Sequence, residues 1–306
     1  MDTKQIEYIL KIAEENNITK AAEKLFITQS ALNQQLLKLE KELGTPLFHR
    51  SRTNWRLTEA GEIYIEGAKA ALQIKNTTYN RIYDVVSARK GHLTIGLTPG
   101  RGLRMFTAIY PELHRSFPNL DVRPIEMRVR AQQDAIAKGE IDVGLMTLAR
   151  RDQTSDTYYP LKQEELVLII PAGHPLAAKA APSGEPLTTL DLIELRYEPF
   201  VLMDKTSTLR SSCDLLFEKA GFAPNILFET NNTSGIAAMV QSTLCCGIIP
   251  RYYTLGLTEG VACFSLPERP SWEIVISCQK NGYLNSGARE FIRLAREYWE
   301  NSAPLF

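Results

Sequence analysis

The sequence lacks any segment suited to a membrane, because none of its apolar runs approaches the roughly 18 residues that a spanning helix needs. It also lacks the basic and then apolar start of a secretory signal peptide, since Met1–Glu7 is polar and partly acidic. We therefore expect a cytoplasmic protein without a membrane partner. Its 306 residues, 44% of them hydrophobic, are too many for one ordinary core and predict two or three globular domains.

Cysteine is scarce, and its spacing fits neither a zinc site nor a disulfide framework. The five cysteines are an odd number and include no Cys-x-x-Cys motif. They are Cys213, Cys245, Cys246, Cys263 and Cys278. Because free cysteine is among the most buried residue types, we expect reduced, mostly buried thiols, and neither a metal nor another cofactor.

Catalytic motifs are absent as well. The chain contains no Gly-x-Ser-x-Gly, phosphate-binding loop or His-Glu-x-x-His pattern, and its four histidines are scattered at positions 49, 92, 114 and 174. We therefore expect a protein that is not an enzyme.

Net charge is zero, but the charges are unevenly distributed. Residues 1–90 carry 14 Lys and Arg against 11 Asp and Glu, and the remainder carries 21 against 24. A mildly basic front and a mildly acidic body suit a small DNA-binding module attached to a larger domain.

The first 58 residues show the pattern of a helix-turn-helix. Helices are predicted over 3–15, 19–25 and 29–43, with Thr28 as the N-cap of the third helix and Gly44 as its stop. Apolar residues of the third helix recur at steps of four, three and four and predict one buried stripe: Leu32, Leu36, Leu39 and Leu43. Polar side chains occupy the opposite face, as in a recognition helix.

A basic stretch and a long helix follow. His49, Arg50, Arg52 and Arg56 precede or lie in a short predicted strand over 54–58, which resembles a β-wing. Thr58 would cap a helix over 59–86, about 40 Å long at 1.5 Å per residue. Its apolar stripe predicts a partner helix from a second copy; packing onto its own chain is the alternative.

Beyond residue 91, predicted strands alternate with helices. Strands are expected at 92–97, 122–127, 141–146, 166–170, 200–203, 226–228, 246–249 and 273–278, and helices at 103–117, 131–138, 208–220, 233–242 and 287–300. The alternation predicts α/β architecture with largely parallel sheets.

An ordered set of motifs along nearly the whole chain resembles the LysR-type transcriptional regulators. The matching segments are Asn17–Leu25, Ile27–Leu32, Leu39–Arg50, Leu57–Gly61, Phe117–Leu120, Gly139–Gly144, Pro171–Leu176 and Gly247–Pro250. Each motif alone is weak, but the ordered set is specific.

The resemblance implies a fold class that is α/β overall. It comprises an N-terminal all-α winged helix-turn-helix over 1–58, a dimerising linker helix and hinge over 59–90, and an effector-binding domain over 91–306. That domain would consist of two Rossmann-like lobes, as in type 2 periplasmic binding proteins: lobe one at 91–161 and 267–306, lobe two at 162–266. The expected partners are double-stranded DNA, a small-molecule effector and further copies of the chain in a homotetramer, with RNA polymerase as a further candidate.

The first turns of a recognition helix enter the major groove, where Asn and Gln can pair with adenine. The predicted DNA-binding residues are Thr28, Gln29, Ser30, Asn33, Gln34, Arg50 and Arg52. Many family members carry Arg or Lys at Gln34 and Leu37, so this chain should make fewer phosphate contacts and depend more on oligomer avidity. An ordinary solvated surface is the alternative for all seven residues.

Polar residues at predicted strand ends indicate an effector site between the lobes. They are Thr98, Pro99, Gly100, Arg128, Arg130, Thr147, Met203, Thr206, Thr208, Thr230 and Asn231. Arg128 and Arg130 favour an organic anion as co-inducer. The alternative is that these residues are helix caps, turn formers and surface charges.

Two other functions stay open at this point. The same regulator could respond to oxidation of Cys213, Cys245 or Cys246 instead of a ligand. A cytoplasmic small-molecule-binding protein with the same two lobes is a weaker alternative, because residues 1–58 would then have no role.

Overall fold

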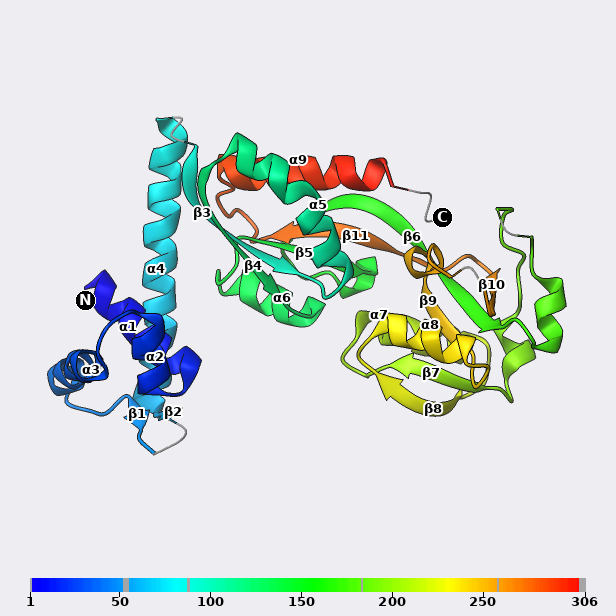
Figure 1. Cartoon of the computed structure of the whole chain (residues 1–306), viewed down its shortest axis with the longest axis horizontal. Coiled ribbons are helices and arrows are strands. Elements are labelled where there is room, and N and C mark those ends of the chain that lie inside the picture. The colour runs from blue at the N-terminus through cyan, green and yellow to red at the C-terminus, as the bar shows by residue number, and fades with distance from the viewer. Residues whose placement is uncertain (1, 52–54, 87–88, 183, 258, 303–306) are drawn as a thin grey trace. The chain divides into compact units, whose positions relative to one another are not determined.

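The chain forms two compact units (Figure 1). We call Met1–His92 with Lys138–Glu140 the helical unit, and Leu93–Ala137 with Ile141–Phe306 the α/β unit. The computed structural model describes residues 2–51, 55–86, 89–182, 184–257 and 259–302.

The described residues of the helical unit form four helices and one small hairpin. In chain order they are α1 Thr3–Glu15, α2 Ile18–Lys24, α3 Gln29–Leu43, β1 Phe48–His49, β2 Arg56–Leu57 and α4 Glu59–Val85. Side-chain caps begin the helices: Thr28 Oγ1 accepts from Ala31 N at 3.2 Å, and Thr58 Oγ1 accepts from Gly61 N at 3.0 Å. Gly44, in the left-handed region at φ +73°, ends α3. The predicted caps and stop are confirmed.

The core of the helical unit confirms most of the predicted stripe on α3. Leu32, Leu36 and Leu39 are buried with Ile9 and Ile12 of α1. The prediction for Leu43 was wrong, since this side chain is 46% exposed. Glu40 is buried on this helix instead, because its carboxylate accepts a hydrogen bond from Leu47 N. The predicted wing strand is shorter in the structure, and residue 54 lies outside the described part of the chain.

The α/β unit is built from nine strands, five α-helices and four short 3₁₀ helices in its described residues. They are β3 Lys90–Leu97, α5 Arg101–Ser116, β4 Asn119–Glu126, α6 Val129–Ala137, β5 Val143–Leu148, η1 Arg150–Asp152, β6 Thr157–Pro171, η2 Pro175–Lys179, η3 Leu192–Leu195, β7 Pro199–Met203, α7 Thr208–Lys219, β8 Asn225–Thr230, α8 Thr233–Gln241, β9 Gly247–Pro250, η4 Arg251–Thr254, β10 Val261–Ser265, β11 Ser271–Cys278 and α9 Ser286–Glu300.

The strands form two lobes joined by β6. The larger sheet has the order β10-β6-β11-β5-β3-β4, with β9 also beside β6, and β7 pairs with β8 in a second sheet. We call β3–β5 with α5, α6 and α9 the first lobe, and β7–β10 with α7 and α8 the second lobe. Figure 1 shows α5 and α9 on one face of the first lobe's strands and α6 on the other. The first half of β6 pairs with β11, and its second half pairs with β9 and β10.

The expectation of largely parallel sheets was wrong. The pairs β3–β5 and β7–β8 are parallel, whereas β11–β5, β11–β6, β10–β6 and β6–β9 are antiparallel. Parallel neighbours need a long crossover, usually through a helix. Both parallel pairs have such a crossover, since α7 lies between β7 and β8, and α5, β4 and α6 lie between β3 and β5.

Candidate functional sites

The first candidate site is the exposed beginning of α3 in the helical unit. Thr28, Gln29, Ser30 and Gln34 are exposed, and Asn33 is partly exposed. Because Leu32, Leu36 and Leu39 anchor the opposite side of the helix in the core, this polar face is held outward by packing.

Two of these side chains already have hydrogen-bond roles. Thr28 caps α3, and Gln29 Oε1 accepts from Thr19 Oγ1 of α2 at 3.2 Å. The Gln29 amide nitrogen still offers two donors, and the hydroxyl of Thr28 can still donate. The helix start therefore presents amides and hydroxyls with both donors and acceptors, which is the chemistry that reads base edges.

Arg50 is tied to the helix that precedes it. Its Nη2 pairs with Oε2 of Glu40, and its guanidinium lies 5.5 Å from the centre of the Trp55 ring. Glu40 Oε1 also accepts from Leu47 N at 2.8 Å, so one buried carboxylate joins α3 to the start of the wing. Arg52 lies outside the described residues.

The second candidate site is a cavity of about 850 Å³ in the α/β unit. Nine of the eleven predicted effector residues line it: Thr98, Pro99, Gly100, Arg128, Thr147, Met203, Thr206, Thr208 and Asn231. Arg130 and Thr230 are not among its lining residues in the described part of the chain. Arg130 is exposed in the first turn of α6, and Thr230 Oγ1 accepts from Asn232 N at 3.2 Å, so Thr230 acts as a turn former.

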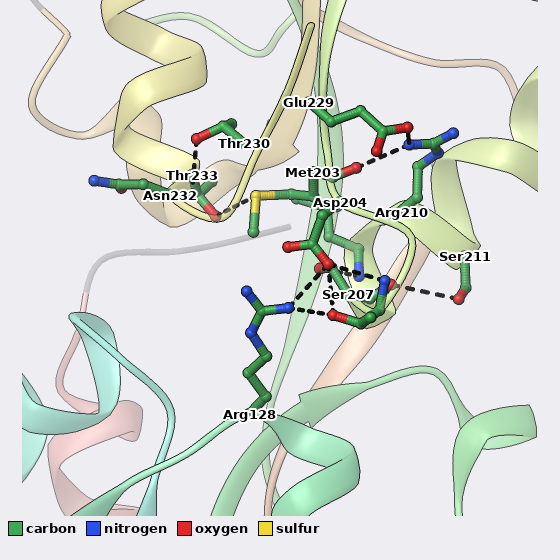
Figure 2. Close-up of polar contacts among 12 residues, drawn as sticks. Arg128, Met203, Asp204, Ser207, Arg210, Ser211, Glu229, Thr230, Asn232 and Thr233 are labelled. Atoms are coloured by element: carbon green, nitrogen blue, oxygen red, sulfur yellow. Dashed lines mark hydrogen bonds and ion pairs between the residues drawn. The ribbon is translucent and has the colours of Figure 1, made fainter. Parts of the chain in front are cut away.

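Three helices begin at this cavity. Gly100 and Arg101 start α5. Ser207 caps α7 and Asn232 caps α8, and both caps are labelled in Figure 2. Helix N-termini carry a partial positive charge from their unpaired amides, and they favour a negative ligand. The two lobes also touch here, since Thr208 Oγ1 donates to the carbonyl of Thr147 at 3.1 Å.

The cavity lining includes three arginines and, in the described chain, neither aspartate nor glutamate nor lysine. Arg101 is buried and pairs with Glu164, whose side chain is fully buried; Nη1 and Oε2 are 2.5 Å apart. Its Nη2 donates to Thr147 Oγ1 at 2.8 Å. The Glu164 carboxylate accepts two further hydrogen bonds, from Trp272 Nε1 at 2.7 Å and from Tyr252 N at 3.0 Å. Arg101 is therefore neutralised within the wall.

Arg128 is also paired, but across the cavity. Figure 2 shows its guanidinium directed at Asp204, with Nη1 2.9 Å from Oδ1. The turn that carries Asp204 is fixed by Arg210, whose Nη1 donates to the Met203 carbonyl at 3.0 Å and pairs with Glu229 at 2.6 Å. Arg128, which the sequence indicated as an effector contact, is thus already paired with a carboxylate of the chain.

Arg104 is the remaining cation of the cavity. Its guanidinium lies 6.0 Å from the centre of the Tyr252 ring, and among the described residues no carboxylate pairs with it. Sequence reasoning missed Arg101, Arg104, Tyr252 and Trp272. The first two lie inside a helix rather than at a strand end, and the aromatic residues approach only through long-range folding, so no local signal marked them.

The described residues contain no cluster of three His, Cys, Asp or Glu side chains that could hold a metal ion. Within the same residues, no helix is both long enough and apolar enough to cross a membrane.

Two family models match the chain. The model described as bacterial regulatory helix-turn-helix protein, lysR family, matches residues 3–62, and the LysR substrate binding domain matches residues 87–300. The HTH-type transcriptional regulator YcgK of Bacillus subtilis (strain 168) is 29% identical, over 97% of this chain and 94% of its own. The Hca operon transcriptional activator HcaR of Escherichia coli (strain K12) is 26% identical, over 97% and 98%.

Solved structures share the fold. A full-length OxyR variant from Pseudomonas aeruginosa has a TM-score of 0.69 at 22% identity, with 98% of this chain and 95% of that chain covered. CbnR in complex with its target DNA has a TM-score of 0.66 at 21% identity, with 97% and 100% covered. The predicted fold class is confirmed: a helix-turn-helix unit followed by a mixed α/β substrate-binding domain.

Proposed function

The chain belongs to the LysR family of bacterial transcriptional regulators, and from that premise we propose that it controls a promoter in response to an organic anion bound in the α/β cavity. It would act in the cytoplasm on double-stranded DNA, as a homo-oligomer. No catalytic step is required of it.

The cavity lining is the observation that carries the anion proposal. Three arginines line the cavity, the described lining contains no carboxylate, and three helices begin there. A small organic anion would meet Arg104, the uncommitted cation, together with the hydroxyls of Thr98, Thr147 and Thr208. Charge-assisted hydrogen bonds of this kind are roughly twice as strong as neutral ones.

The proposed base contacts are made by Gln29, Ser30, Asn33 and Gln34, with Thr28 at the helix start. Their exposure on α3 supports this assignment. Arg50, held by Glu40 through one nitrogen, keeps other N–H groups that could donate to a phosphate. Arg52 stays a prediction.

Oxidation of a cysteine is the alternative trigger. Burial raises the pKa of Cys213 and of Cys246 to about 12, which keeps these thiols protonated and poorly reactive. The cavity therefore supports a ligand more strongly than the thiols support oxidation.

The first test is a gel-shift experiment with the DNA directly upstream of the chain's own gene, at two salt concentrations. Specific retardation that survives competitor DNA is expected. Equal binding to every fragment would contradict base reading by α3, and absence of binding by a well-folded oligomer at low salt would contradict the regulator itself.

A variant sharpens this test. Gln34→Ala should weaken specific binding roughly ten- to hundredfold, because a bidentate amide–base pair contributes about 1–3 kcal/mol of discrimination. Binding to non-specific DNA should not change. Gln35→Ala is the matched control, since Gln35 is an exposed glutamine on the same helix, about 100° further round, beside the buried stripe. Equal losses in both variants would contradict the assignment.

A further inference from the structure

Two arginine–carboxylate pairs lie at the cavity, and they differ in how many of the carboxylate oxygens accept hydrogen bonds. In the Arg101–Glu164 pair both carboxylate oxygens accept hydrogen bonds: Oε2 from Arg101 and Trp272, and Oε1 from Tyr252 N. Glu164 has no exposed surface. A buried pair with complete partners is a permanent part of the wall, because breaking it would leave a charge without compensation.

The Asp204 carboxylate is bound through one oxygen only. Its Oδ1 accepts from Arg128 Nη1 at 2.9 Å, from Thr206 N at 3.0 Å and from Thr206 Oγ1 at 2.5 Å. Its Oδ2 is shielded from solvent and has no hydrogen-bond partner among the described residues. A desolvated and unpaired carboxylate oxygen is unfavourable, so this arrangement is less stable than the number of bonds to Oδ1 suggests.

The donors around Oδ1 make up a binding position for a carboxylate. We call Arg128 Nη1, Thr206 N and Thr206 Oγ1 the carboxylate seat. It combines a guanidinium, a backbone amide and a hydroxyl, and Arg128 and Thr206 both line the cavity. Asp204 itself is not among the lining residues.

The seat also spans the two lobes. Arg128 directly precedes α6 in the first lobe, and Asp204 follows β7 in the second lobe (Figure 2). Thr206 lies two residues beyond Asp204. Arg128 Nη1 also donates directly to Thr206 Oγ1, so the anion in the seat adds a second link between Arg128 and the opposite wall.

We propose that Asp204 occupies the carboxylate seat when no effector is bound. The carboxylate of a bound effector would then take the place of the Asp204 carboxylate. Displacement would break the ion pair between the lobes and give Asp204 Oδ2 access to solvent. The effector class is thereby narrowed from anions to molecules with a carboxylate of the size of the aspartate head group. This inference rests on the proposed function.

Protonation does not account for the release of Asp204 at neutral pH. Desolvation by burial raises the pKa of Asp204, but the hydrogen bonds from Thr206 and the charge of Arg128 outweigh it, and the pKa lies below its usual value. The ion pair is therefore present at neutral pH and is lost only as the pH falls through that lowered value. Near neutral pH, exchange of one carboxylate for another is the remaining route.

Acetate is the probe that tests the seat, because it has the head group of aspartate without the backbone. In full-length Asp204→Ala the seat is vacant, and saturable binding of one acetate per chain is expected by calorimetry. The wild-type chain should bind acetate at least about tenfold more weakly, since the internal carboxylate competes. Adding Arg128→Gln to Asp204→Ala should abolish the binding.

Glu273→Ala provides the matched control. It removes the carboxylate partner of Arg150, which is 84% exposed and lies outside the cavity lining. Because Arg150 is exposed, its loss of a partner in Glu273→Ala should create no saturable acetate binding. If Asp204→Ala fails to fold, the isosteric Asp204→Asn takes its place, because a neutral amide competes less well for a guanidinium than acetate does.

Equal acetate affinity in wild type and Asp204→Ala would overturn the proposal, and so would binding that survives Arg128→Gln. Neither result would affect the proposed function, which the gel-shift experiment tests on the wild-type chain without acetate. Loss of DNA binding in that experiment would contradict the regulator, whatever acetate does.

Discussion

At the scale of single residues, burial determines the chemistry of the cysteine thiols. Desolvation raises the pKa of Cys213 and of Cys246 to about 12 and that of Cys263 to about 11. It raises the pKa of Cys245 and of Cys278 as well. Because the thiolate is the reactive form, each of the five side chains reacts slowly while the chain is folded.

Thiol titration checks this directly. At pH 7.5 a thiol with a pKa near 12 is ionised in fewer than about one molecule in ten thousand, so the native chain should react with a disulfide reagent far more slowly than free cysteine. After unfolding, all five thiols should react at the rate of free cysteine. A native thiol that reacts rapidly, with a rate that levels off below pH 8, would favour the oxidation trigger instead.

At the scale of elements, β6 runs from one lobe to the other and has two buried glutamates that help to position the cavity. Glu164 and Glu165 are adjacent and fully buried, and successive side chains of a strand point to opposite faces. Glu164 holds Arg101, whereas Glu165 holds Arg251 at 3.0 Å and Arg269 at 3.2 Å. Ion pairs therefore fix both faces of the strand where it passes from β11 to β9 and β10.

Removing one of these carboxylates should destabilise the α/β unit strongly. Glu164→Leu leaves Arg101 buried without a counter-charge, and we expect a loss of about 3–5 kcal/mol in the free energy of unfolding, measured by urea denaturation. Glu164→Gln should cost less, because its amide oxygen can still accept from one donor. The control is Glu268→Gln, which breaks an exposed pair with Lys219 and should leave the denaturation midpoint unchanged. Similar midpoints for Glu164→Leu and the control would refute a structural role for Glu164.

How far the sequence predicts these elements depends on whether their signals are local. The caps and the stop of α3 are local, since Thr28 and Gly44 act within one turn, and both predictions are confirmed. The full length of β6 could not be predicted, because charged residues such as Glu164 interrupt its apolar pattern and are stable there only through partners such as Arg101. β10 was missed altogether, as it is a short strand defined by pairing with β6.

The cavity follows the same rule. Residues at strand ends, such as Thr98 and Thr147, could be placed from the strand pattern alone, and both line the cavity. The pairing of Arg128 with Asp204 could not, because 76 residues separate them and only the folded chain brings their charges together. The assignment of individual contacts to DNA and effector stays a prediction.

At the scale of the whole molecule, one face of α4 carries a line of exposed aliphatic residues. Ile63, Ile74 and Val85 follow one another at steps of 11 residues, and they are 68%, 69% and 84% exposed. At about 100° per residue, 11 residues turn the helix through three turns and 20°, so the three side chains lie on one line. A line of exposed aliphatic residues about 33 Å long, at 1.5 Å per residue, is best covered by the same helix of a second copy.

Ile74→Glu should separate the two copies of a dimer, so that their two helix-turn-helix units no longer bind DNA together. Burying an unpaired carboxylate in an apolar contact costs several kcal/mol, so the dimer should weaken at least about a hundredfold in analytical ultracentrifugation. Linked modules can exceed single-site affinity by about 10²- to 10⁴-fold, and specific DNA binding should fall within that range. Because the salt slope counts neutralised phosphates, it should also fall to about half. Glu66→Lys, about 80° from Ile74 around α4, is the control and should leave the dimer intact. An unchanged sedimentation coefficient for Ile74→Glu would show that another surface holds the copies together.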